Sequence, residues 1–312
     1  MILVTGCAGY IGSHICYILK KKRINFIGID NLEYSNKENI ISKKNFYKYN
    51  ISSKKTDELI KKKNIKNVIH CAAYSYVIDG ENNKNKYLKN NITDTKKFID
   101  ICKKNSIQNF IFLSSSNVYK DGKSLFKESD LTKPKNIYGQ NKLEIEKYIK
   151  KIDLNNFVIL RLFNVVGLFM KFNVFRFKKK NYQRLFFKIA DKKNSPQLKF
   201  YKINNKKYYP KRDFVNIKDL TDLILKVIIK MKTNKINKIF NVGSGKAISI
   251  NLIAKIFNVY DKDILFLKPT TIAIKELIIT KASINLVKNY FKWMPRKNIK
   301  YSIISTLKYS KF

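Results

Sequence analysis

The sequence is short of the residues that build metal sites, disulfide frameworks and flexible linkers. It contains two histidines, His14 and His70, which we interpret as structural because nothing suggests a metal site. No stretch is rich in glycine, proline or serine, so we expect no linker of that kind. Four cysteines lack metal-like spacing, and we interpret them as reduced thiols of a cytoplasmic protein. They are Cys7, Cys16, Cys71 and Cys102.

Long apolar runs are absent as well. No run approaches the roughly 20 residues that a membrane-spanning helix needs. The first residues lead directly into an apolar, strand-like segment that leaves no room for a signal peptide. Hydrophobic residues make up 45% of the 312 residues, which is typical of a globular protein with a large core. We therefore expect a globular, cytoplasmic protein.

Acidic residues are few. The chain has 22 of them against 65 lysines and arginines, so its formal net charge is +43. Taken alone, such a charge indicates a polyanionic partner such as nucleic acid. However, lysine is spread along the whole chain, and arginine, the preferred bidentate ligand of phosphate, is scarce. We interpret the charge as compositional drift, and nucleic acid is the less favoured alternative.

The first thirty residues carry the most specific pattern. An apolar run at 2–4 leads into a turn with Gly6, Gly9 and Gly12, a helical pattern follows, and a second apolar run ends at Asp30. This order builds a dinucleotide site, because the glycines let the backbone approach the pyrophosphate at a helix N-terminus. An acid after the second strand binds ribose hydroxyls and repels a 2′-phosphate, which favours NAD over NADP.

Strands and helices alternate through the first half of the chain. Alternation predicts an α/β fold with a Rossmann-type, doubly wound parallel sheet, whose ligands bind beyond the carboxyl ends of the strands. The predicted strands are Ile2–Thr5, Phe26–Asp30, Phe46–Tyr49, Val68–Ala72, Phe110–Ser114 and Val158–Leu162. The predicted helices are Ile11–Lys22, Asp57–Lys63, Tyr87–Lys104 and Tyr138–Lys151.

The pattern loosens after Gly167. A helix at Ile217–Met231, a short strand at Ile239–Val242 and a helix at Ile250–Phe257 are predicted there. We expect an NAD-binding Rossmann domain at 1–166 and a smaller substrate lobe at 167–312, with excursions back to the first domain.

A serine run at 114–116 ends the fifth predicted strand, and Tyr138 and Lys142 open a later helix. Residues four apart lie on one helical face, so an ammonium beside the phenol favours the phenolate. This lowers the phenol pKa, normally near 10, toward working pH. With a serine hydroxyl from the strand end, the set predicts a proton relay for oxidising an alcohol next to a nicotinamide.

Together these motifs resemble the extended short-chain dehydrogenases/reductases, and most of all the UDP-glucose 4-epimerases. The matching segments are 6–12, 30–35, 68–73, 90–91, 110–119, 161–167, 212–215 and 241–245. The resemblance implies that Ser115, Tyr138 and Lys142 are catalytic. It implies that Ser115, Asn164 and Arg212 bind a nucleotide sugar. The NAD contacts that it implies are Gly6, Gly9, Tyr10, Ile11, Gly12, Asp30, Asn31, Asn50, Ile51, Ala72, Ala73, Asn91, Tyr138 and Lys142.

The implied reaction is epimerisation at C4 of a nucleotide sugar through a transient 4-keto sugar, with UDP-glucose and UDP-galactose or a UDP-N-acetylhexosamine as substrates. The acetamido sugars are included because the family's bulky aromatic gate has no aromatic counterpart near Thr280. A homodimer is implied as well, paired through the predicted helices at Tyr87–Lys104 and Tyr138–Lys151. Both helices carry apolar stripes that we expect to exceed the needs of sheet packing.

The chain also departs from the family pattern. Ser75 stands where the family has a lysine, Asn50 stands where it has an aspartate, and segment 270–274 lacks its late arginine and Gly-Asp motif. The loop from Tyr201 to Arg212 is long, as in epimerases. One alternative is a nucleotide-sugar 4,6-dehydratase, although its Asp-Glu pair is replaced by Ser-Asn at 116–117. Another is a non-catalytic relative that binds NAD or nucleic acid.

Overall fold

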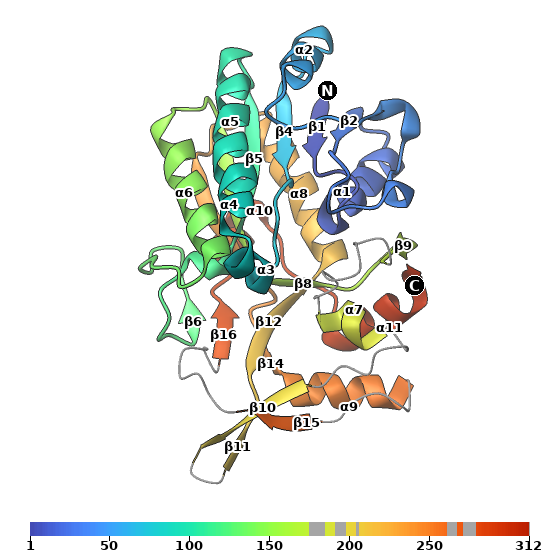
Figure 1. Cartoon of the computed structure of the whole chain (residues 1–312), viewed down its shortest axis with the longest axis vertical. Coiled ribbons are helices and arrows are strands. Elements are labelled where there is room, and N and C mark those ends of the chain that lie inside the picture. Colours follow the sequence, from blue (N-terminus) through green and yellow to red (C-terminus); the bar gives the residue numbers. More distant parts are fainter. Residues whose placement is uncertain (175–184, 191–197, 204–205, 261–266, 271–278, 312) are drawn as a thin grey trace.

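A computed structural model describes residues 1–174, 185–190, 198–203, 206–260, 267–270 and 279–311. A large α/β unit is built around a parallel sheet, and smaller sheets with further helices lie beyond the carboxyl ends of its strands (Figure 1). The α/β fold with a Rossmann-type sheet and a smaller lobe is therefore confirmed.

The main sheet, within the described ranges, has seven strands and every pairing is parallel. In order across the sheet they are β3 (Phe46–Tyr47), β2 (Phe26–Ile29), β1 (Ile2–Thr5), β4 (Asn67–His70), β5 (Asn109–Ser115), β7 (Phe157–Leu162) and β13 (Lys238–Val242). The edge strand β13 comes from the second half of the chain, so the chain crosses back to the first sheet. The predicted strands agree with these bounds to within three residues at each end.

Helices cover both faces of this sheet. Successive residues of a strand point to opposite faces, so Ile2 and Val4 belong to one apolar core and Leu3 to the other. The helices of the first core are α1 (Tyr10–Lys21), α8 (Ile217–Met231) and α10 (Asn285–Phe291). Those of the second are α2 (Lys54–Lys62), α5 (Thr95–Lys104) and α6 (Ile137–Lys151). Burial on both faces explains why the strands read as unbroken apolar runs.

The helix predicted at Tyr87–Lys104 is interrupted. The structure has α4 (Lys84–Leu88), a π-helical segment η3 (Lys89–Asp94) and then α5. A π turn adds a residue to the helical repeat, and such turns are frequent at functional sites. A short helix α3 (Val77–Asn82), which the sequence analysis does not predict, precedes α4. Short 3₁₀ turns are η1 (Lys37–Asn39), η2 (Lys43–Asn45) and η4 (Ser116–Val118).

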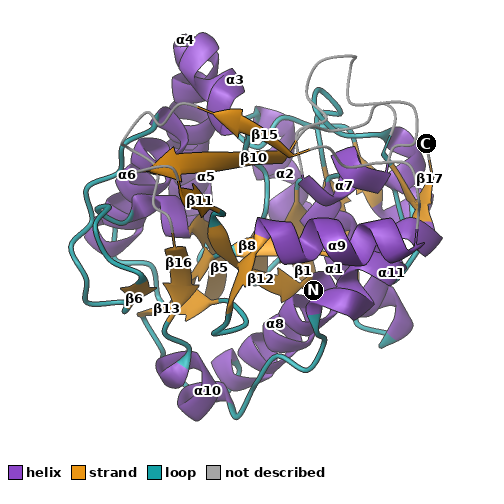
Figure 2. Cartoon of the chain, turned by 90° about the horizontal axis from the view of Figure 1, so that it is seen from below, coloured by secondary structure: helices purple, strands orange, loops and turns teal. Residues whose placement is uncertain are grey.

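The smaller lobe is assembled from distant segments (Figure 2). One sheet contains β6 (Leu125–Phe126), β8 (Asn164–Val166), β12 (Lys211–Asn216), β14 (Ala247–Ser249) and β16 (Ile279–Ala282). Another contains β10 (Leu198–Ile203), β11 (Lys206–Tyr208) and β15 (Leu267–Thr270), and β9 (Phe172–Asn173) pairs with β17 (Ser310–Lys311). The helices are α7 (Leu185–Ala190), α9 (Ile250–Tyr260) and α11 (Ile299–Tyr309). The segment interpreted as a long loop at Tyr201–Arg212 instead includes the antiparallel hairpin β10–β11.

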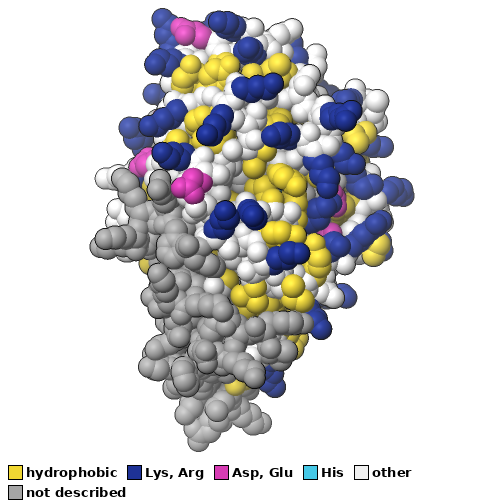
Figure 3. All heavy atoms as spheres, turned by 90° about the vertical axis from the view of Figure 1, so that its right-hand side faces the viewer, with side chains coloured by type: hydrophobic (Ala, Val, Ile, Leu, Met, Phe, Trp, Pro, Cys, Tyr) yellow, Lys and Arg dark blue, Asp and Glu magenta, His cyan; other side chains and the backbone are white. Residues whose placement is uncertain are grey.

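Positive charge is not gathered into one patch on the face that Figure 3 shows. On the face shown in Figure 3, lysine and arginine side chains are spread across the described surface. This distribution agrees with the interpretation of the net charge as compositional. In the described ranges, no helix combines the length and apolarity needed to cross a membrane, and no three His, Cys, Asp or Glu side chains are grouped as they would be around a metal ion.

Candidate functional site

A cleft runs along the carboxyl ends of the strands, the edge at which parallel sheets bind ligands. It comprises a cavity of about 560 Å³ and a smaller one of about 100 Å³. The residues that line both are Gly6, Gly9, Tyr34, Cys71, Ala73 and Tyr74. The two cavities are therefore adjoining parts of one elongated site.

The glycine turn after β1 forms part of both cavities. Gly6 has φ +66°, a backbone conformation that other residues rarely adopt. A Cβ at Gly12 would lie only 2.1 Å from the Gly6 carbonyl oxygen, so glycine is required for α1 to pack against the turn. Tyr10 and Ile11, in the first turn of α1, line the larger cavity. The positive end of the helix dipole is thereby presented to the cleft.

Asp30 follows β2 and lines the smaller cavity together with Asn31, Asn50 and Ile51. One carboxylate oxygen accepts from Ala8 N (3.0 Å), and the other accepts from Leu32 N (2.8 Å). Burial raises the pKa of Asp30, while these bonds and one from Ser35 lower it. The carboxylate is thus held in a fixed orientation at this end of the cleft.

The turn after β4 supplies Ala72 and Ala73, which line the cleft as expected. Asn91, also expected to touch the cofactor, is absent from the lining residues of both cavities. Its side chain accepts from Tyr74 N and donates to Tyr74 O, each at 2.9 Å. The neighbouring Asn90 lines the smaller cavity instead. We interpret Asn91 as shaping the cleft through Tyr74.

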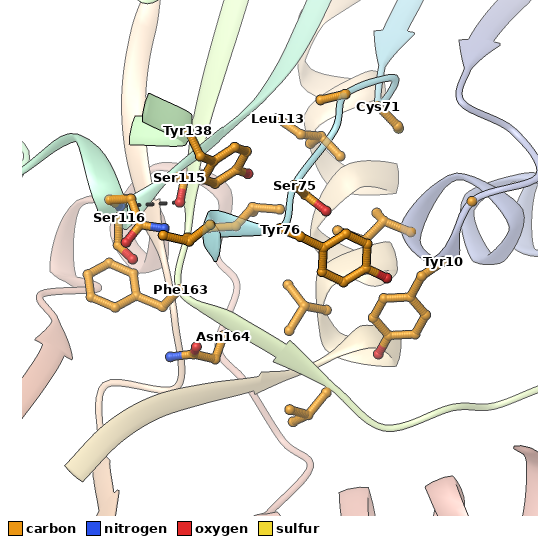
Figure 4. Close-up of a pocket in the computed structure, with 18 of the residues that line it drawn as sticks. Tyr10, Cys71, Ser75, Tyr76, Leu113, Ser115, Ser116, Tyr138, Phe163 and Asn164 are labelled. Atoms are coloured by element: carbon orange, nitrogen blue, oxygen red, sulfur yellow. Dashed lines mark hydrogen bonds between the residues drawn. The ribbon is translucent and has the colours of Figure 1, made fainter. Parts of the chain in front are cut away.

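Ser115, Tyr138 and Lys142 line the larger cavity. Ser115 ends β5 and accepts from Asn117 N (3.2 Å), while Tyr138 and Lys142 lie in the first turns of α6. Figure 4 shows Ser115 and Tyr138 next to each other, with Tyr10 and Tyr76 on the other side of the view. The structure brings together the three residues that the sequence separates.

Gly139 explains why α6 approaches β5 so closely. A Cβ at this position would lie 2.3 Å from the Asn117 carbonyl oxygen. The Asn136 side chain caps the helix by accepting from Gly139 N at 2.7 Å, a contact that stabilises a helix N-terminus by about 1 kcal/mol. The cap and the glycine together place Tyr138 beside the end of β5.

Lys142 is buried, and its ammonium group lies among a backbone carbonyl and aromatic rings. Its Nζ donates to Leu113 O at 2.7 Å and lies 5.9 Å from the centre of the Tyr138 ring. Burial lowers its pKa to about 8, although Cys71 and Glu146 act in the opposite direction. Below that pH, Lys142 is an ammonium that stabilises negative charge on a neighbouring phenol oxygen.

A buried ion pair between β7 and α6 lies next to the site, and the sequence analysis did not predict it. Arg161 Nη2 donates to Glu146 Oε2 at 2.7 Å, and both side chains are at most 4% exposed. Ser114 also donates to Glu146. The available signal was spacing, because Glu146 lies four residues after Lys142 on the same helical face. Since α6 binds both Leu113 O and Ser114 Oγ, the end of β5 is fixed relative to Tyr138.

The outer end of the larger cavity carries Asn164 and Arg212. Asn164 Nδ2 donates to Asp213 O at 3.0 Å. Arg212 is the register partner of Thr280 in the β12–β16 pair, and Thr280 lines the cavity too. Four aromatic residues line the cavity as well: Phe163 and Phe214, which belong to the matching segments 161–167 and 212–215, and Phe186 and Phe187, which the sequence analysis did not identify. Residues 271–274 of the expected late-arginine segment lie outside the described residues.

Comparison with known proteins supports this geometry. The model of the NAD dependent epimerase/dehydratase family matches residues 2–243. The chain belongs to this family. An uncharacterized UDP-glucose epimerase of Bacillus subtilis is 34% identical over 181 residues, 53% of this chain and 57% of that protein. A UDP-glucose 4-epimerase of Schizosaccharomyces pombe is 34% identical over 183 residues, 53% and 52% of the two chains. The chain thus spans about half the length of these relatives.

Solved structures share the fold over nearly the whole chain. A UDP-glucose 4-epimerase has a TM-score of 0.89 at 22% identity, with 99% of this chain and 96% of that chain covered. One from Stenotrophomonas maltophila, with bound NAD and formylated UDP-arabinopyranose, has a TM-score of 0.88 at 20% identity, with 99% and 97% covered. A UDP-N-acetylglucosamine 4-epimerase from Methanobrevibacter ruminantium has a TM-score of 0.83 at 25% identity, with 99% of this chain and 97% of that chain covered.

NAD is the cofactor of this family, and the residues of this chain fit it. The Gly6–Gly12 turn leaves no space for side chains where a pyrophosphate approaches the backbone. Asp30 lies at one end of the cleft and the Tyr–Lys pair lies toward the other. An extended dinucleotide can therefore reach both.

Proposed function

We propose that this protein is an NAD-dependent nucleotide-sugar 4-epimerase. The observation that carries the proposal is the convergence of Tyr138, Lys142 and Ser115 on the cavity that the glycine turn also lines. An alcohol bound there has a base, a cation and a hydroxyl within the same pocket as the cofactor.

The residues divide the proton chemistry between them. Tyr138 accepts the proton of the sugar 4-hydroxyl, and Lys142 stabilises the phenolate while its own pKa of about 8 keeps it charged at neutral pH. Ser115 hydrogen-bonds to the reacting oxygen. When bound, NAD supplies the hydride acceptor and then the donor, so no co-substrate is consumed. Tyr138 returns the proton once the 4-keto sugar has presented its other face.

A UDP-sugar is the substrate that we propose. Arg212 lines the larger cavity and suits a diphosphate, because a guanidinium binds phosphate oxygens in pairs. Asn164 lies beside it as an amide ligand for the sugar or the nucleotide. The names of the relatives, which are mostly UDP-glucose 4-epimerases, support the same class.

The competing activities make different demands on the site. A dTDP-D-glucose 4,6-dehydratase of Dictyostelium discoideum is 36% identical over 138 residues, 41% of this chain and 31% of that protein. However, the positions of the dehydratase Asp-Glu pair are occupied here by Ser116 and Asn117, which line the larger cavity. Neither is an acid that could promote loss of water. A non-catalytic relative would bind NAD and leave UDP-sugars unchanged.

The test is conversion of UDP-galactose to UDP-glucose by the purified protein. Tyr138→Phe should lower turnover by about 10² to 10⁴-fold and leave NAD binding intact, because only the phenol oxygen is lost. Tyr148→Phe is the matched control, because Tyr148 lies on the same helix and its hydroxyl donates to Asp100 of α5, away from the cavity lining. No conversion by the native protein would contradict the proposal. Near-native turnover of Tyr138→Phe would assign proton transfer to another group.

We also propose a homodimer paired through α5 and α6. The structure corrects one argument for it, because the main apolar side chains of these helices pack on the sheet: Phe98, Ile99, Ile145 and Ile149. The outer side carries the Lys96–Glu144 ion pair instead. The proposal therefore rests on the resemblance to epimerases. Light scattering at about micromolar concentration tests it, and a monomer would contradict it.

A further inference from the structure

The two cavities of the cleft meet along a stretch whose residues line both. Its lining includes the glycine-turn residues Gly6 and Gly9, and also Tyr34 and Tyr74. The end that suits adenosine carries Asp30, and the reacting end carries Tyr138. A dinucleotide that occupies both ends must therefore pass through the stretch that these four residues share.

Tyr34 and Tyr74 come from opposite sides of this stretch. Tyr34 lies in the segment after β2, and Tyr74 lies in the segment after β4. Strands β2 and β4 flank β1 in the sheet, so segments that follow them meet only across the glycine turn after β1. The two rings do meet, with centroids 4.3 Å apart.

A cation and two carboxylates join the same segments. Lys86 Nζ, from α4, lies 4.7 Å from the Tyr34 ring centre and 5.3 Å from that of Tyr74. Lys86 pairs with Glu33, to which the Tyr74 hydroxyl also donates. The Tyr34 hydroxyl donates to Asp79 of α3 at 3.2 Å. In Figure 1, α3 and α4 lie at the carboxyl-end side of the sheet.

These contacts can open. The side chains of Lys86 and Glu33 are 43% and 40% exposed, and exposed ion pairs contribute about 0 to 1 kcal/mol each. Tyr74, in contrast, is held in place through its backbone by Asn91. Leu32 N and Ser35 Oγ hold the backbone around Tyr34 to Asp30, so it is the Tyr34 side chain that has to part from Tyr74 and Lys86.

We propose that Tyr34, Tyr74 and Lys86 form a clasp that closes over the middle of bound NAD and limits its release. The clasp positions the cofactor and takes no part in the proton chemistry. It concerns NAD, the cofactor of the family, and does not depend on which sugar is converted. A reaction that regenerates its cofactor in every cycle has no need for fast exchange, so a closed clasp is compatible with the proposed epimerase.

The test is the rate at which NAD leaves the full-length protein, followed after mixing the NAD complex with excess ADP-ribose. Tyr34→Ala and Lys86→Ala should each release NAD about tenfold faster, because stacking and cation–π contacts across the cleft are lost and weaker binding is expressed mainly in the dissociation rate. Tyr34→Phe keeps the ring and should remain within about threefold of native. Lys84→Ala, an exposed neighbour on α4, is the matched control.

Four further outcomes are informative. Unchanged release from both alanine variants overturns the clasp, as does equal acceleration by Lys84→Ala. A native protein that binds no NAD overturns both the clasp and the cofactor assignment. A native protein that binds NAD without converting UDP-sugars contradicts the proposed function, and the release rates still decide the clasp. Thermal unfolding of each variant without NAD separates a local effect from a loss of the fold.

Discussion

Asp30 shows how one carboxylate joins binding and local structure. It accepts backbone N–H groups of Ala8, in the glycine turn, and of Leu32, beyond β2. The hydrogen bonds that orient it come from the protein itself, so the carboxylate is already in position for the ribose that we expect it to bind. Such preorganisation reduces the conformational cost of binding.

We predict that Asp30→Ala weakens NAD binding at least about tenfold, since hydrogen bonds to charged groups contribute roughly 1.5 to 3 kcal/mol. Titration of the purified variant with NAD and with NADP measures this effect. The native protein should prefer NAD, because the buried carboxylate repels a 2′-phosphate. Equal native affinities for the two dinucleotides would contradict the assigned role. Asp30→Asn, which keeps the shape and loses the charge, separates repulsion from packing.

The histidines predict a loss of stability in acid. Burial lowers the pKa of His14 to about 4 and that of His70 to about 3. The unfolded chain takes up these protons near pH 6.5, so between that pH and the folded values the unfolded state binds more protons. The free energy of unfolding should therefore decrease as the pH is lowered, by at most about 1.4 kcal/mol per pH unit for each histidine. Denaturant midpoints between about pH 7 and pH 5 measure it.

His14→Phe is the control for this prediction, because the His14 ring packs against Phe169 and Phe172 and a phenyl ring cannot titrate. Its pH dependence should be flatter than that of the native protein. The buried Asp30 and Asp213 have raised pKa values and act in the opposite direction, so the difference between the two proteins is the quantity to compare. Parallel curves would show that His14 does not contribute.

At the scale of elements, the contact of α6 with the turn after β5 determines the geometry of the site. We predict that Gly139→Ala lowers turnover by about ten- to a hundredfold, because a Cβ that would lie 2.3 Å from Asn117 O displaces Tyr138. In an unhindered helix the same change is stabilising. Steady-state turnover and thermal unfolding measure the two effects. Gln140→Ala, at the exposed next position, should behave like the native protein.

Elements with local signals could be predicted from the sequence. Four strands of the main sheet, β1, β2, β5 and β13, are apolar runs that end in a glycine, a serine or an acid. The Tyr–Lys pair identifies the start of α6 within one residue. The π turn in η3 could not be predicted in this way, because the residues around it keep an ordinary helical pattern. The same holds for Asn91, since a buried amide can bind a ligand or a backbone, and its neighbours in space decide which.

The second lobe was harder to predict because its pairings join distant segments. Arg212 meets Thr280 across β12 and β16, which are more than sixty residues apart in the sequence. The short helix α7 carries Phe186 and Phe187 into the cavity, although its surroundings read only as a basic and aromatic stretch. Neither residue carries a local signal that separates a cavity wall from an ordinary core.

At the scale of the whole molecule, residues from distant parts of the chain line the larger cavity, and we predict that they decide which sugar fits there. Thr280 lines the cavity, and no aromatic residue occurs from Leu267 to Val287. We predict that UDP-N-acetylglucosamine is converted within about a hundredfold of the efficiency for UDP-glucose. Competition between the two sugars measures the ratio. Thr280→Tyr should reduce conversion of the acetamido sugar more than that of UDP-glucose. If the native protein converts UDP-N-acetylglucosamine more than about a hundredfold less efficiently than UDP-glucose, another residue acts as a steric gate and the prediction is wrong.

The position of β13 has a consequence for biosynthesis. This strand pairs with β7 from Val158 to Leu162, yet it follows β7 by more than seventy residues. Until the ribosome has delivered it, β7 presents an unpaired apolar edge, which is the feature through which nascent sheets aggregate. Completion of the first sheet thus waits for much of the second lobe. A fragment that ends at residue 166 would keep the glycine turn and the Tyr–Lys pair and still depend on chaperones to remain in solution.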